Sequence, residues 1–89
     1  MATFVLVRHN VRDFSEWKPV YDADRPNRIA AGLTDKQLLR GVGDSNEVVL
    51  LFEAADLDRA KAFVDSPQLR EAMQHGGVLG KPDLSFLEG

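Results

Sequence analysis

Hydrophobic positions along the chain fall first into short, nearly unbroken runs. Residues 3–8 (TFVLVR) and 47–53 (EVVLLFE) are apolar and rich in β-branched side chains, which predicts two strands with both faces buried. Residues 35–42 (DKQLLRGV) and 84–87 (LSFL) mix polar and apolar positions, and this suits strands at the edges of a sheet. Pro82 comes just before the last of these strands, and proline is tolerated at an edge because a ladder hydrogen bond is not needed there.

The stretch 13–32 (DFSEWKPVYDADRPNRIAAG) has a helical pattern that two prolines interrupt. Apolar residues recur at helical spacing in two groups separated by the mostly polar residues 22–25. The first group is Phe14, Trp17, Val20 and Tyr21, and the second is Ile29 and Leu33. We predict a helix that starts near Ser15 or Glu16, so that Pro19 falls near the first turn. The helix should break near 23–26, with Asp24 as the cap of a second piece that ends at Gly32.

A tight turn at 43–46 (GDSN) should join the second and third strands as a hairpin. After the third strand, Asp56 is placed to cap a helix, and Ser66-Pro67 to start another that ends at 75–77 (HGG). The order is therefore β-α-β-β-α-β, which is a ferredoxin-like α+β fold with a four-stranded antiparallel sheet and helices on one face. In this topology the first and third strands are central.

Composition limits the class of protein. The chain has 89 residues, a net charge of -3 and no cysteine, which predicts one domain over residues 1–89 without disulfides, catalytic thiols or CxxC metal sites. Neither a nucleic acid nor an anionic membrane is an expected partner, because both select basic surfaces. The apolar run at 4–7 is too short for a signal-peptide core, so we expect a cytoplasmic protein.

The central strands are more apolar than one layer of helices requires. An antiparallel sheet covered on one face should alternate apolar and polar residues, because its other face meets water. The runs FVLV and VVLLF do not alternate. We therefore expect a homodimer through the sheet face that points away from the helices. The alternative is a monomer whose sheet exposes a few valines.

These features resemble a known family. The order of elements, the doubly buried central strands, DFSEWKPVYDA at the first helix and SPQLREAMQHGGVLGKPDLSFLE at the end of the chain resemble the dimeric α+β barrel superfamily, and within it the small antibiotic-biosynthesis-monooxygenase-like and cyclase-like proteins. The resemblance covers essentially the whole chain. It implies two sheets packed back to back, with a pocket in each subunit between helices and sheet.

Characterised members of that superfamily include cofactor-independent quinone-forming oxygenases and haem-degrading enzymes. The haem-degrading pattern has an Asn on the first strand and a Trp and a His on the second helical segment. Here Asn10 is displaced towards a loop, His75 matches, and the only Trp is Trp17 in the first helix. One match of three argues against haem degradation, and we expect no metal or other cofactor.

The residues that we expect to line the pocket are His9, Trp17, Tyr21, Phe63, Met73 and His75. Trp17 and Tyr21 share a helical face, and the broken helix would be one wall of the pocket. His75 is the best catalytic candidate because histidine titrates near neutral pH, although it equally suits a helix C-terminus. The alternative is a kinked helix absorbed by tight packing, with Trp17 wholly in the core.

The arginines Arg8, Arg25, Arg28 and Arg40 should be solvated or paired with Asp22, Asp24 and Glu53. Together these inferences predict a small-molecule-binding protein. The candidate activities are those of a cofactor-independent monooxygenase or cyclase that acts on an aromatic or polyketide-like compound. A non-catalytic ligand-binding or assembly domain is the alternative. An RNA-recognition domain has the same topology, but 47–53 lacks the aromatic residues and basic start that it needs.

Overall fold

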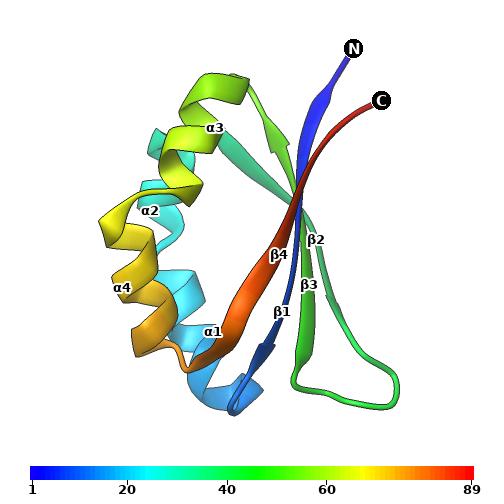
Figure 1. Cartoon of the computed structure of the whole chain (residues 1–89), viewed down its shortest axis with the longest axis vertical. Helices are drawn as coiled ribbons and strands as arrows, with labels where there is room; N and C mark the ends of the chain where they lie inside the picture. The colour runs from blue at the N-terminus through cyan, green and yellow to red at the C-terminus, as the bar shows by residue number, and fades with distance from the viewer.

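The computed structural model describes residues 1–89, which form a four-stranded antiparallel sheet with every helix on one face (Figure 1). The elements are β1 (Thr3–Val11), α1 (Phe14–Ala23), α2 (Arg25–Ala30), β2 (Leu33–Arg40), β3 (Glu47–Ala54), α3 (Leu57–Val64), α4 (Pro67–His75) and β4 (Val78–Glu88). The strand order β2-β3-β1-β4 places the two most apolar strands in the centre. The predicted ferredoxin-like fold is therefore confirmed. None of the helices has the length and apolar character needed to cross a membrane.

The two faces of the sheet follow from the register of the central strands. Val5 pairs with Phe52, Val7 with Leu50 and His9 with Val48. All six side chains are buried, so this face lies under the helices. Their neighbours along each strand, beginning with Phe4 and Leu51, point to the opposite face because side chains alternate across a strand. Figure 1 shows no element of the chain covering that opposite face.

The first helical region breaks where the sequence predicts, between Ala23 and Arg25. Its predicted start was wrong. The helix begins at Phe14, because the Asp13 side chain caps it by accepting the Ser15 N–H at 2.9 Å. Pro19 consequently lies inside α1 and removes one helical hydrogen bond. The Asp24 side chain does not cap the second piece.

The edge strands differ from the predicted ranges. β2 begins two residues early, at Leu33, since that side chain is part of the core. β4 is much longer than the predicted 84–87 and contains Pro82 in its interior. The pairing with β1 jumps from Arg8–Asp83 to Asn10–Leu79. The residues of β4 between these pairs form a bulge, which is a position in an edge strand where proline is accommodated.

The caps of the second helical region were predicted correctly. Asp56 accepts the Arg59 N–H at 3.1 Å at the start of α3, and Ser66 accepts the Leu69 N–H at 3.2 Å at the start of α4. Gly76 ends α4 against α1, and a β-carbon at Gly76 would lie 3.1 Å from Trp17. This close approach fixes the end of α4 beside the aromatic side chain.

One hairpin residue fixes the start of α1. The side-chain oxygen of Asn46 accepts the Phe14 N–H at 3.0 Å, and its amide nitrogen donates to the Arg12 carbonyl at 3.4 Å. The Asn46 carbonyl also accepts the Val11 N–H at 2.9 Å. The turn between β1 and α1 is thereby attached to the β2–β3 hairpin.

We expect Asn46→Ala to lower the free energy of unfolding by about 1–2 kcal/mol, because a half-buried backbone N–H loses its acceptor. Asn27→Ala is the control, since the exposed side chain of Asn27 bonds only to the side chain of Asp24, and its effect should stay within about 0.5 kcal/mol. Urea unfolding measures both. Equal effects of the two substitutions would show that Asn46 does not anchor the helix.

Candidate functional site

A cavity of about 70 Å³ lies between the helices and the sheet. Most of its wall is apolar, and the polar side chains that reach it are those of His9, Asp24 and Arg28. The helices contribute the following apolar and aromatic residues to the wall: Trp17, Val20, Tyr21, Phe63, Val64, Leu69, Ala72 and Met73. An apolar space with a few polar groups at its rim suits a small, uncharged ligand.

Five of the six residues expected at a pocket line this cavity: His9, Trp17, Tyr21, Phe63 and Met73. His75 does not. It is exposed at the C-terminus of α4 and borders a separate, open groove between α1 and α4, together with Asp24 and Glu71. The sequence pattern correctly assigned His75 to α4, but the last turn of that helix, which carries His75, extends past the cavity. The structure contains no group of three or more metal-ligating side chains.

Aromatic rings form a continuous stack along one side of the cavity. The His9 ring meets Trp17 edge-on at 5.6 Å between centroids, and Trp17 stacks on Tyr21 at 4.7 Å. The guanidinium of Arg28 in turn covers the Tyr21 ring, at 3.7 Å from the ring centroid. Such contacts hold the rings in fixed orientations. The wall on this side is therefore rigid and aromatic.

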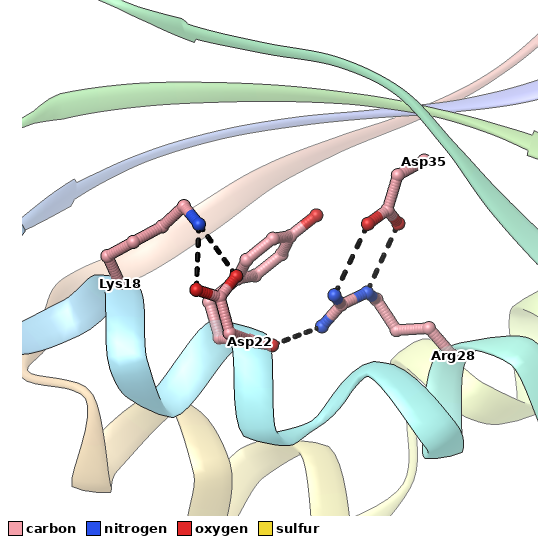
Figure 2. A network of polar contacts seen from close by, with 5 residues as sticks. Lys18, Asp22, Arg28 and Asp35 are labelled. Carbon is pink, nitrogen blue, oxygen red and sulfur yellow. Dashed lines mark hydrogen bonds and ion pairs between the residues drawn. The ribbon is translucent and has the colours of Figure 1, made fainter.

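Arg28 is the residue that sequence reasoning missed. It is 4% exposed, and its Nε and one terminal nitrogen face the Asp35 carboxylate of β2 at 3.3 and 3.4 Å (Figure 2). Its other terminal nitrogen donates to the Tyr21 carbonyl at 2.7 Å. The predicted pairings were wrong for this arginine, because the break before α2 turns Arg28 towards the sheet. Asp22 pairs instead with Lys18, as Figure 2 shows, and Glu53 with Lys36.

The half-buried ring of Tyr21 is held in its neutral form. Burial raises the pKa of Tyr21 to about 12, and the Asp35 carboxylate adds to this rise while Arg28 opposes it. The phenol therefore keeps its proton at physiological pH. It serves as a hydrogen-bonding aromatic wall and not as a base.

His9 is the polar group at the Trp17 end of the stack. It is 6% exposed, and burial lowers the pKa of His9 below its ordinary value of 6.5. The imidazole is therefore neutral at pH 7. Its Nδ1 is buried and has no hydrogen-bond partner, which is unusual because nearly all buried polar atoms have one.

The volume of the cavity limits what it holds. An engineered cavity that admits benzene measures about 150 Å³, and drug-sized pockets measure about 300–1,000 Å³. At about 70 Å³, this cavity takes a one-ring compound only if its wall moves outward. No residue of α4 is fully buried, so an outward shift of that helix breaks fewer apolar contacts than opening the buried core of the sheet would.

The structure resembles several solved structures over its whole length. A proposed antibiotic biosynthesis monooxygenase from Bordetella bronchiseptica is 14% identical, with a TM-score of 0.78 over 100% of this chain and 98% of the other. SnoaB, a cofactor-independent oxygenase from Streptomyces nogalater, is 14% identical, with a TM-score of 0.76 over 99% of this chain and 92% of its own. Rv0793 from Mycobacterium tuberculosis is 18% identical, with a TM-score of 0.70 over 100% of this chain and 95% of its own.

No protein-family model and no curated protein matches the sequence. At these identities the structural likeness shows the fold alone. The chain thus has the fold of the antibiotic-biosynthesis-monooxygenase-like proteins, and the predicted resemblance is confirmed at that level.

We expect Arg28→Lys to lower the free energy of unfolding by about 1–3 kcal/mol, because an ammonium cannot bond the Asp35 carboxylate and the Tyr21 carbonyl with the same geometry. Arg25→Lys is the matched control at an exposed position of the same helix and should change stability little. Thermal unfolding measures both variants, since a loss of 1 kcal/mol in the free energy of unfolding lowers the melting temperature by about 4–8 °C for a domain of this size. If Arg28→Lys leaves the melting temperature unchanged, the ion pair does not hold the helix break.

His9 should make stability depend on pH. The unfolded chain takes up a proton at His9 near pH 6.5, and the folded chain only at lower pH. The free energy of unfolding therefore falls as pH drops below about 6.5 towards the folded-state pKa, and is unaffected by His9 above that window. His9→Asn should remove this loss, whereas His75→Asn, at an exposed site, should retain it. Parallel curves for the wild type and His9→Asn between about pH 7.5 and 5 would contradict this expectation.

Proposed function

We propose that this chain, with the fold of the antibiotic-biosynthesis-monooxygenase-like proteins, binds a small aromatic compound in the cavity between its helices and its sheet. The observation that carries the proposal is the cavity itself, which is apolar and has the Trp17–Tyr21 stack as one wall. Aromatic ring edges and aliphatic side chains favour an aromatic ligand through edge-to-face contacts and area burial. The ligand site comprises His9, Trp17, Tyr21, Phe63 and Met73, with Arg28 in support.

We propose cofactor-independent oxygenation as the chemistry of this site. SnoaB, which shares the fold, is a cofactor-independent oxygenase. A water-poor cavity suits a reaction in which an electron-rich aromatic compound meets molecular oxygen, because both reactants are apolar. The absence of a metal and of any other cofactor remains a prediction, as do the cytoplasmic location and the single domain over residues 1–89.

The second candidate is a binding domain without catalysis. The observation that favours it is the small number of polar groups at the cavity: Asp24 and His9, together with Arg28, which already has partners in Asp35 and Tyr21. Acid–base chemistry needs a positioned group whose proton can move. Only an activity measurement separates the two candidates.

We also propose that the protein is a homodimer. The sheet face opposite the helices carries apolar side chains on all four strands, and those on the outer strands are well exposed, with Leu39 at 52%, Leu79 at 53% and Leu87 at 45%. The central strands add Phe4, Leu6, Val49 and Leu51, which are half-buried. A second copy of the same face is the simplest cover, since isologous contacts build most small oligomers.

For binding, we expect toluene, an uncharged one-ring probe, to change the fluorescence of Trp17, the chain's only tryptophan, which lines the cavity. Ala72→Phe should abolish the change, because a phenyl group at this α4 position fills the cavity. Ala62→Phe, at an exposed position of α3, is the control and should leave it intact. If the wild type shows no saturable response, the proposed function is wrong. Oxygen uptake with electron-rich aromatic compounds, in the absence of added metal or flavin, then distinguishes the oxygenase from the binding domain.

For assembly, light scattering of the wild type should give about twice the 9.9 kDa mass of one chain. Leu51→Lys, which puts a charge at the centre of the proposed interface, should give a single-chain mass or an unfolded protein. Ile29→Lys is the control on the helical side, where Ile29 is 60% exposed, and should remain dimeric. A wild-type mass near 9.9 kDa at micromolar concentration would refute the dimer.

A further inference from the structure

His9 has a hydrogen-bonding group that the protein leaves unused. Its side chain lines the cavity and is 6% exposed, and its buried Nδ1 has no partner. A neutral imidazole has one N–H donor and one nitrogen acceptor. An unpaired polar group in such a place destabilises the folded chain. This cost is recovered when a ligand supplies the missing partner.

The surroundings of His9 explain why no protein group reaches it. On one side, its strand neighbour is the apolar Val48. On the other side, the bulge of β4 lies between the pairs Arg8–Asp83 and Asn10–Leu79, so no residue of β4 is paired with His9. Above it lies the Trp17 ring, nearly perpendicular to the imidazole and 5.6 Å away between centroids. The side chain therefore has apolar neighbours on the sheet and the helix, and the cavity in front of it.

Charged ligands do not fit this place. The wall around His9 is apolar, and the cationic charge of Arg28 is already neutralised by Asp35 at 3.3 Å. Asp24, the remaining ionisable group at the cavity, would repel an anion. Bringing an unpaired charge into such a site is strongly unfavourable. The ligand must therefore be neutral and supply its hydrogen bond through an uncharged group.

We propose that His9 is the residue that selects the ligand, and that the ligand is a compact aromatic compound with a hydroxyl group that bonds to the His9 imidazole. A hydroxyl both donates and accepts, so it satisfies His9 in either neutral tautomer, whereas an ether or a carbonyl only accepts. The ring of the ligand would lie against Trp17 and Tyr21. This inference rests on the proposed function, because it assigns the ligand class of the same cavity.

The test compares two probes of nearly equal shape, phenol and toluene, by calorimetry and Trp17 fluorescence. We expect the wild type to bind phenol about tenfold more tightly than toluene, which is the effect of one additional buried hydrogen bond. In His9→Leu the preference should disappear or reverse. His9→Gln, which keeps a donor and an acceptor, should retain part of the preference.

The outcomes separate this inference from the proposed function. If toluene and phenol bind the wild type equally, the role of His9 is wrong and the cavity remains a ligand site. If neither binds, the proposed function fails and the inference fails with it. A preference for phenol that is unchanged in both His9 variants would also overturn the inference. Near-UV circular dichroism and light scattering show whether each variant keeps the fold, and the wild-type comparison stands even if a variant does not fold.

Discussion

The buried guanidinium of Arg28 holds the helical layer in position. It bonds the carbonyl of Tyr21 near the end of α1, pairs with Asp35 on β2 and covers the ring of Tyr21. At the helix break the Tyr21 carbonyl accepts the Asp24 N–H at 3.2 Å and, as a second and shorter bond, a guanidinium N–H of Arg28 at 2.7 Å. These contacts link the end of α1 and the ring of Tyr21 to β2.

The cavity is a consequence of that geometry. Two short helices joined at a bend cannot lie flat on the sheet together, so the aromatic stack fills one side while space remains beside it. α3 and α4 close this space with apolar side chains, yet α4 buries none of its residues fully. The result is one rigid wall, held by stacking and an ion pair, and one wall that is free to adjust. This combination suits a site that must admit a ligand and then enclose it.

Both faces of the sheet carry apolar side chains from the same strands. On the helical face the central strands contribute a closed core around Val5, Val48 and Phe52, while on the other face they expose apolar side chains. The same strands therefore support the cavity and the proposed dimer, and the two are separated by one layer of backbone. His9 is the exception on the helical face, because there β1 places a polar side chain among apolar ones.

The sequence by itself determined the order of elements, the central strands, the helix break and five of the 17 residues that line the cavity, because periodicity, prolines and caps act between residues close in the chain. It did not determine the length of β4, the pairing of Arg28 with Asp35 or the position of His75 outside the cavity. Those depend on contacts between segments far apart in the chain. The bulge at Pro82 exists only because β1 and β4 pair on both sides of it, and Arg28 meets Asp35 only once α2 lies against β2. The tertiary structure alone decided that His9 lies buried and unpaired at the cavity, since no local pattern shows which partners a side chain will lack.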